Sequence, residues 1–233
     1  MNEFSIIIPV LNEEKNIIKL VKEIFYTLED YHNFELIIVN DGSKDNTLEN
    51  LKSLKIEFPI KIINNINNYG QSYSINEGIK QSNYNTIVTI DGDGQNNPVD
   101  IPKLLDVYFA NEDIQLVGGI RKNRKDNFIK LISSKVANKV RSKILQDDCT
   151  DTGCSLKVFD KKVFLKFPFF HGIHRFLPAL FKSFGNKTSF IDVDHRPRLQ
   201  GISKYGILER LFKGLIDLIR VVIITKKYKK NRG

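Results

Sequence analysis

Two carboxylates stand one residue apart in the stretch TIDGDGQNNPVD, directly after an apolar run. They are Asp91 and Asp93, and two ionised groups this close repel each other unless a cation lies between them. Mg²⁺ and Mn²⁺ accept carboxylate oxygens and can hold the oxygens of a diphosphate at the same time. The spacing therefore predicts a Mg²⁺ or Mn²⁺ site at this pair, with Gln95 as a third oxygen ligand.

Basic side chains are expected near such an ion, because a departing diphosphate carries developing negative charge. The candidates are Arg121, which follows the fifth apolar run, and Arg196, Arg198 and Lys204 in HRPRLQGISKY. Gly201 between the last two indicates a loop that carries cations. Arg121 has an alternative interpretation as the first member of the basic run behind it.

The elements that position these residues are visible as alternating strands and helices. Apolar, β-rich runs predict strands over 4–10, 34–40, 60–64, 85–90 and 114–119. Helical periodicity lies between them, over 13–29, 44–57, 71–81 and 98–110. This alternation predicts an α/β fold with a doubly wound, mostly parallel sheet and right-handed crossovers. Ligands bind such sheets beyond the carboxyl ends of the strands, which is where the two aspartates fall.

Polar junctions follow the first four predicted strands, and we expect them to meet at one edge of the sheet. They read PVLNEE, NDGSKDNT, NNYGQS and DGDGQNNP. Some of their residues also have plain structural roles. Asn12 could cap the helix that starts at 13, Gly42 could supply a positive φ in a turn, and Asn97 followed by Pro98 is typical of a helix start.

The second half of the chain has a different pattern. It predicts a basic amphipathic helix at about 127–146, strands at 155–159 and 187–195, and a helix at about 173–184. The segment 207–224 has one apolar stripe interrupted by charges, so it packs on the core or lies in a bilayer interface. The basic KKYKKNRG that follows favours a membrane surface.

The net charge of +9 indicates an anionic partner. Nine Lys or Arg stand against one acidic residue in 121–143. Solvated helix faces are the plain alternative for such a run. A nucleic-acid-binding protein is a second alternative, but the basic segments lack interleaved aromatic residues, and that function would leave the four junctions unexplained.

Several other functions are disfavoured by missing motifs. The chain has neither G-x-G-x-x-G after its first strand nor a P-loop, which argues against dinucleotide oxidoreductases and P-loop NTPases. Two cysteines and four histidines give no convincing zinc site. The absence of a signal peptide and of an 18-residue apolar stretch predicts a cytoplasmic protein, acting at the cytoplasmic face of the membrane.

Six ordered segments together resemble glycosyltransferase family 2. They are IIIPVLNEE, IIVNDGSKDNT, NNYGQSYSINEGI, TIDGDGQNNPVDIPKLL, DTGCSLKVFDKKVF and HRPRLQGISKYG, between about residues 4 and 206. The branch they resemble includes dolichyl-phosphate mannose synthase and bacterial polyprenyl-phosphate glycosyltransferases. The resemblance implies a GT-A fold over residues 1–206, followed by an amphipathic helix and basic tail over 207–233.

The resemblance also implies an activity and a set of site residues. The activity is an inverting, metal-dependent transfer of one sugar from a UDP- or GDP-linked donor to a polyprenyl or dolichyl phosphate. Nucleotide-sugar binding falls to Pro9, Asn12, Glu13, Asp41, Gly70, Asp91, Arg121, Arg198 and Lys204. The metal ligands are Asp91, Asp93 and Gln95, and the catalytic residues are Asp93, Asp151, Arg198 and Lys204. Asp151 is read as a catalytic or site-organising carboxylate, with a turn aspartate as the alternative.

Four positions depart from the family pattern. Leu11 stands where Tyr is frequent, and Asn40 stands where Asp is frequent. Gly92 and Gly94 replace the usual Ala and Leu of the metal motif. These departures keep both carboxylates of the metal motif. They prevent us from carrying the family's preference for a particular donor sugar or nucleotide over to this chain.

The acceptor defines the remaining alternatives. A phosphate acceptor is already anionic and needs only alignment, whereas a hydroxyl acceptor requires a general base. A family member that glycosylates a saccharide or lipid hydroxyl in envelope polysaccharide synthesis is therefore the second interpretation, and a catalytically silent scaffold is a third. The expected partners are a nucleotide-sugar, a polyprenyl phosphate, a peripheral membrane surface and a membrane-protein partner, with no nucleic acid.

Overall fold

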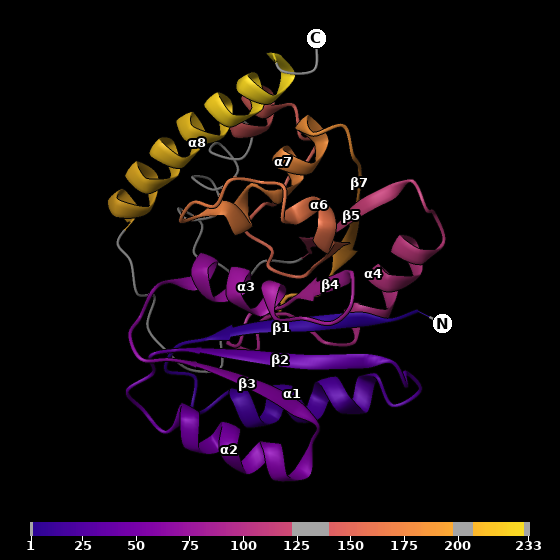
Figure 1. The fold of residues 1–233 in the computed structure, drawn as a ribbon, viewed down its shortest axis with the longest axis vertical. Helices are drawn as coiled ribbons and strands as arrows, with labels where there is room; N and C mark the ends of the chain where they lie inside the picture. The colour runs from indigo at the N-terminus through magenta and orange to yellow at the C-terminus, as the bar shows by residue number, and fades with distance from the viewer. Residues whose placement is uncertain (1, 123–139, 198–206, 231–233) are drawn as a thin grey trace.

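One sheet of seven strands organises the molecule (Figure 1). The computed structural model describes residues 2–122, 140–197 and 207–230. The strands are β1 (Phe4–Val10), β2 (Phe34–Asp41), β3 (Ile60–Asn65), β4 (Thr86–Thr89), β5 (Ile114–Arg121), β6 (Lys157–Asp160) and β7 (Lys187–Val193). Their order is β3-β2-β1-β4-β6-β5-β7, and only β6 among them runs antiparallel to its neighbours. The predicted α/β fold with a mostly parallel sheet is confirmed.

Strand β6 lies between β4 and β5, a placement that the alternation of strands and helices did not indicate. It pairs with both neighbours in antiparallel register, with Val88 and Val117 opposite Val158. This insertion brings the segment before β6 to the carboxyl end of β4. Residues 151–157 therefore border the predicted metal pair.

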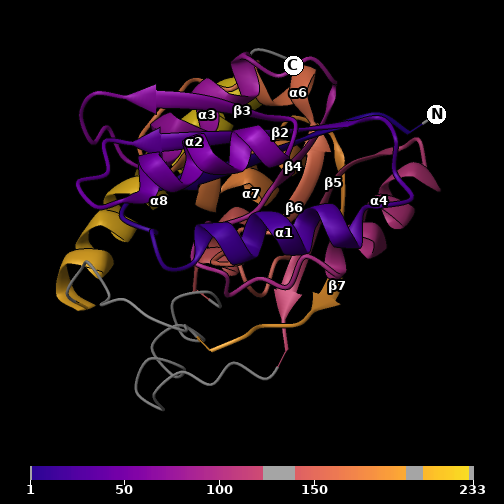
Figure 2. The same cartoon turned by 90° about the horizontal axis from the view of Figure 1, so that it is seen from below.

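Helices cover both faces of the sheet (Figures 1 and 2). One face carries α1 (Ile17–Thr27), α2 (Thr47–Glu57) and α4 (Asp100–Phe109). The other carries α3 (Gln71–Lys80), α6 (Lys161–Phe164), the 3₁₀ turn η1 (Ile173–Arg175) and α7 (Leu177–Ser183). The long α8 (Ile207–Lys230) packs outside α7. No helix within the described parts of the chain combines the length and the apolarity that a membrane span requires.

Three predicted helix starts were wrong by a few residues. Helix α2 begins at Thr47, not at residue 44. Helix α1 begins at Ile17 with Asn16 as N-cap, because Asn12 adopts a φ of 54° and its side chain bonds the neighbouring junction instead. Helix α4 begins at Asp100 with Val99 as N-cap. The turn at Gly42 is as expected, with φ 73°.

The predictions for the second half of the chain have mixed outcomes. The helix predicted over 173–184 is divided into η1 and α7 at Phe176. Of the basic helix predicted over 127–146, residues 140–145 are helical and 127–139 lie outside the described residues.

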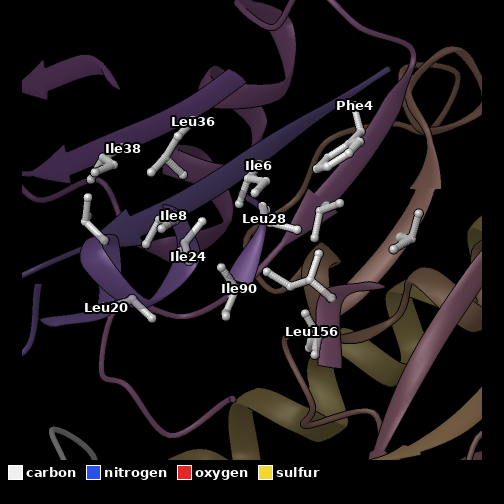
Figure 3. Close-up of a cluster of buried hydrophobic side chains, with 14 of the residues drawn as sticks. Phe4, Ile6, Ile8, Leu20, Ile24, Leu28, Leu36, Ile38, Ile90 and Leu156 are labelled. Carbon is white, nitrogen blue, oxygen red and sulfur yellow. The ribbon is translucent and has the colours of Figure 1, made fainter. Parts of the chain in front are cut away.

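The core fills both sides of the sheet because successive residues of a strand point to opposite faces. Ile6 and Ile8 of β1 pack with Leu20 and Ile24 of α1 (Figure 3), while Ile7 contributes to the cluster on the other face. The strand residues of both clusters are buried, so the strands form a rigid support. The junctions at the carboxyl ends of β1 to β4 are fixed to that support.

Candidate functional site

Asp91 is held at the end of β4 by two neighbours. Its backbone N–H donates to Ser155 Oγ at 3.1 Å, and Gln71 Nε2 donates to its Oδ1 at 2.7 Å. Burial, followed by the charge of nearby Asp93, raises the pKa of Asp91 to about 6, although Ser155 and the cations Lys157 and Arg121 oppose the shift. The carboxylate is thus oriented in a place where its negative charge is incompletely compensated.

The residues around this pair fit a divalent cation that the substrate helps to bind. Among the described residues, no group of three or more His, Cys, Asp or Glu could enclose a metal. Two carboxylates with the remaining positions left to water and phosphate oxygens are the usual donor set for Mg²⁺ at nucleotide sites. A Cβ at Gly92 would lie 2.6 Å from Val10 Cγ1, whereas one at Gly94 would meet nothing within 4 Å. The turn is therefore pressed against β1 on one side and open on the other.

Gln95, the predicted third ligand, is turned toward the end of β7. Its Nε2 lies 3.4 Å from His195 Nε2, and its backbone oxygen accepts from the N–H of Arg196 at 2.8 Å. Asp93 Oδ1 accepts from the N–H of Gln95 at 3.1 Å. Gln95 is thus next to the metal pair, with its amide nitrogen engaged elsewhere.

The junctions that follow β1 and β2 are joined by hydrogen bonds. The N–H of Asn12 donates to Ser43 Oγ at 2.9 Å, and Asn12 Oδ1 accepts from the N–H of Lys44 at 2.8 Å. The N–H of Glu13 donates to Thr47 Oγ1 at 2.8 Å. Together with Pro9, which is buried in β1, these residues form one wall beside the carboxyl ends of β1 and β2.

Asp41 fixes the third junction. Its Oδ1 accepts from the N–H of Tyr69 at 3.0 Å and from Asn65 Nδ2 at 3.1 Å, and its Oδ2 accepts from the N–H of Gly70 at 2.8 Å. Gly70 is the N-cap of α3, and the next residue, Gln71, reaches Asp91. Asp41 therefore sets the start of the helix that orients the Asp91 carboxylate.

Asn40, which stands where the family pattern favours Asp, is also committed to the junctions. Its Nδ2 donates to Asn64 Oδ1 at 2.7 Å, and its Oδ1 accepts from Ser43 Oγ at 2.5 Å. The side chain is buried. Asn40 thus connects β3 with the wall formed by Asn12 and Ser43.

Arg121 and Asp151 form a buried ion pair with two parallel hydrogen bonds. Arg121 Nε donates to Asp151 Oδ2 and Nη2 donates to Oδ1, each at 2.7 Å. The charge of Arg121 opposes the rise in the pKa of Asp91, so the guanidinium lies near Asp91 and Asp93. Both predicted residues are therefore in the same region as Asp91.

The predicted cations of HRPRLQGISKY have different outcomes. Arg196 Nη1 donates to Glu23 Oε2 at 2.7 Å and Nη2 donates to Asn97 Oδ1 at 2.6 Å, so this guanidinium binds α1 and the start of α4. Arg198 and Lys204 lie outside the described residues.

The sequence reasoning missed Gln71, Ser155 and Lys157. Lys157 is 3% exposed at the start of β6, opposite the last residue of β4, and its ammonium donates to the carbonyl of Cys154. A lysine inside the apolar run SLKVF was a detectable signal, since a buried charge usually has a functional or structural partner. Gln71 and Ser155 carried no such signal, because only the tertiary structure brings them to Asp91.

Comparisons with known proteins give consistent results. The model of the family described as Glycosyl transferase family 2 matches residues 5–167. A dodecaprenyl-phosphate galacturonate synthase of Rhizobium johnstonii is 34% identical over 237 residues, which cover 99% of this chain and 69% of the relative. An undecaprenyl-phosphate 4-deoxy-4-formamido-L-arabinose transferase of Proteus mirabilis is 34% identical over 223 residues, covering 94% of this chain and 67% of the relative.

Solved structures show the same fold at low sequence identity. Glucosyl-3-phosphoglycerate synthase of Mycobacterium tuberculosis, in complex with Mn²⁺, UDP and glucosyl-3-phosphoglycerate, superimposes with a TM-score of 0.73 and 17% identity. The match covers 96% of this chain and 80% of that one. The same enzyme with Mg²⁺ and UDP gives a TM-score of 0.73 at 16% identity, over 96% and 79% of the two chains.

Proposed function

The chain belongs to glycosyl transferase family 2 and is a glycosyltransferase with a GT-A fold, and from this premise we propose its reaction. It transfers a single sugar, with inversion, from a nucleoside diphosphate sugar to the phosphate of a polyprenyl phosphate. The names of the Rhizobium and Proteus relatives support the acceptor. The UDP and Mn²⁺ or Mg²⁺ bound by the mycobacterial enzyme support the donor and the cofactor.

The observation that carries the proposal is the Asp91 and Asp93 pair at the carboxyl end of β4. Gln71 and Ser155 hold Asp91 in place, and the pair has less positive charge around it than two carboxylates need. A divalent cation bound there would neutralise the diphosphate of the donor and of the leaving nucleotide. Gln95 remains a candidate third ligand.

The donor nucleotide would lie along the joined junctions. We assign its contacts to Pro9, Asn12, Glu13 and Gly70, with Asp41 acting through the loop that it fixes. These groups are rigid before the donor arrives, which lowers the entropic cost of aligning it.

Arg121 is assigned to the diphosphate, together with Arg198 and Lys204. Both carboxylate oxygens of Asp151 accept from Arg121, which supports a positioning role for Asp151 over proton abstraction. An acceptor phosphate is anionic without help, so the reaction needs no general base among these residues. The same geometry is less suited to a hydroxyl acceptor, the second candidate, which would need such a base.

The acceptor lipid places the reaction at a membrane, and we assign the enzyme to the cytoplasmic face, as a peripheral protein or with a membrane-protein partner. A transfer assay tests the function. Purified protein with Mn²⁺ or Mg²⁺ receives a polyprenyl phosphate and, separately, labelled UDP-glucose, UDP-galacturonic acid, UDP-N-acetylglucosamine and GDP-mannose. We expect label from one donor in the organic phase. Label that appears only with saccharide or lipid alcohols would instead establish the hydroxyl acceptor.

A further inference from the structure

A hollow of about 490 Å³ lies between α8 and the segment that precedes η1. It is lined by Pro168, Phe169, Phe170, His171, Arg220 and Ile224. Four of these side chains are apolar, and its volume is within the range of sites that bind small organic ligands. The two basic side chains give it a polar border.

One end of this hollow reaches the start of α3. A Cβ on Gly70 would lie 3.9 Å from His171 Nδ1, and the N–H of Gly172 donates to Ser72 Oγ at 2.7 Å. Gln71, between Gly70 and Ser72, donates from its Nε2 to Asp91 Oδ1 at 2.7 Å. The hollow therefore begins one residue away from the side chain that orients the metal pair.

Arg220 stands on the side of the hollow formed by α8. Its guanidinium carbon lies 5.6 Å from the centre of the Phe170 ring, and its Nη1 lies 3.5 Å from Asp217 Oδ1. The side chain is 46% exposed, so its charge stays in contact with water while its stem covers apolar surface. A ligand that fits here has an apolar body and an anionic end.

The outer face of α8 continues the apolar surface away from the hollow. Within residues 214–228, the part of α8 whose side chains the structure describes, the exposed large apolar side chains are Leu215, Ile216, Ile219 and Ile223, each more than half accessible. Lys226 and Lys227 are exposed on the turn that follows Ile223. An apolar stripe followed by lysines is typical of a helix at the surface of an anionic bilayer. The face and the hollow meet where Ile223 and Ile224 are adjacent.

We propose that this hollow is the acceptor site, and that it holds the isoprene units next to the phosphate of a polyprenyl phosphate. The inference rests on the proposed function. The phosphate points toward His171 and the start of α3, the first isoprene units pack on Phe169, Phe170 and Ile224, and the rest of the chain follows the outer face of α8 into the lipid. This orientation presents the phosphate to a sugar bound at the metal pair.

A photoreactive probe tests the site without requiring turnover. The full chain is mixed with vesicles that contain a short polyprenyl phosphate with a diazirine on its first isoprene unit, irradiated and digested. We expect label on peptides that contain residues 168–171 or 220–224, displaced by unmodified undecaprenyl phosphate. Label confined to other peptides, or label that undecaprenyl phosphate does not displace, would overturn the proposal.

Paired variants sharpen the result. Phe169→Ser removes from the wall a ring that is 43% exposed, and the control Ile56→Ser removes an apolar side chain that is 88% exposed on α2, far from the hollow. Phe169→Ser should lower labelling about tenfold, because it removes most of one apolar contact, and Ile56→Ser should leave it unchanged. Equal labelling of both variants would count against the site.

The two proposals fail in different ways. If the wild type is labelled in the hollow but transfers no sugar from any donor, the proposed reaction is wrong while the lipid site stands. If it transfers sugar to polyprenyl phosphate but is labelled elsewhere, the reaction stands and the site is wrong.

Discussion

Arg121 and Asp151 are joined side by side through two hydrogen bonds of 2.7 Å, and their side chains are only 14% and 8% exposed. The N–H of Arg121 also donates to Asp151 Oδ2 at 3.2 Å. The pair ties the end of β5 to the segment before β6. It therefore fixes the Arg121 guanidinium near Asp91 and Asp93 before any substrate binds.

Replacing Asp151 by Asn tests this relationship. The variant leaves a largely buried guanidinium without its carboxylate, which should lower the free energy of unfolding by about 3–5 kcal/mol. Urea denaturation measures the loss. Asp113→Asn is the control, because the side chains of Asp113 and its partner Lys187 are 69% and 68% exposed, and an ion pair this exposed to water contributes little to stability. Equal stability of Asp151→Asn and wild type would contradict the structural role.

Replacing Asp93 by Asn tests the metal site. The variant removes one of two repelling carboxylates, so the metal-free protein should keep or gain stability. UDP binding in the presence of Mn²⁺, measured by calorimetry, should weaken by at least the ~10–100-fold that loss of a supporting residue causes at metal sites. Asp113→Asn serves as the control here too, since it keeps both metal carboxylates. Wild-type UDP affinity in Asp93→Asn with Mn²⁺ would refute the assignment.

The sequence predicted the fold and the position of Asp91 and Asp93 at the edge of the sheet because both have local signals. Apolar runs without alternation indicate buried parallel strands, and two aspartates after such a run fall at the carboxyl end of the sheet. The partners of these residues have no local signal. Ser155 reaches Asp91 only because β6 inserts next to β4 in antiparallel register, and the pair of Arg121 with Asp151 joins residues thirty positions apart.

Local reasoning also assigned some polar residues to the wrong task. Asn12 is a residue type that often caps helices, but its Oδ1 accepts from the N–H of Lys44 in the neighbouring junction. Arg196 has the charge expected of a phosphate ligand, but its guanidinium donates hydrogen bonds to Glu23 and Asn97. In both cases a long-range partner competes with the local role, and no single segment of sequence contains both members.

We expect the protein to lose stability in mild acid because of His174. Burial, with the charges of Arg175 and Lys157, lowers the pKa of His174 to about 3. In the unfolded chain His174 has a pKa near 6.5, so below that pH its imidazole is protonated in the unfolded state but stays neutral in the folded state. The free energy of unfolding therefore falls as pH drops below about 6.5. Between pH 7 and pH 5 the loss should be about 1–2 kcal/mol.

His174→Gln provides the comparison for this pH effect. Ser72 Oγ lies 2.7 Å from His174 Nδ1, and a glutamine oxygen can accept the same hydrogen bond without titrating. Asp91, with its pKa raised to about 6, changes stability in the opposite direction but does so in both proteins. The difference between the two urea midpoints should therefore shrink as pH falls from 7 to 5. A constant difference would show that His174 does not titrate on unfolding.

Gly172 controls how α8 attaches to the enzyme. Its φ is 102°, and a Cβ there would lie 2.4 Å from Asp217 Oδ2, the atom that accepts from Arg175 Nη2 at 2.7 Å. Gly172→Ala should therefore break this ion pair and destabilise the protein by more than about 1 kcal/mol. Amide hydrogen exchange should speed up in residues 214–228 of α8.

A matched variant on the helix itself separates docking from helix formation. Gly214 lies in α8 with no atom within 4 Å of its Cβ position, so Gly214→Ala should stabilise the helix by up to about 1 kcal/mol and slow exchange there. Because Arg220 and Ile224 line the hollow from α8, Gly172→Ala should also reduce diazirine labelling of 220–224 while Gly214→Ala preserves it. Equal exchange in α8 of Gly172→Ala and wild type would show that the ion pair of Arg175 with Asp217 does not hold the helix in place. The stack of Tyr228 on Phe184 would then be the next contact to remove.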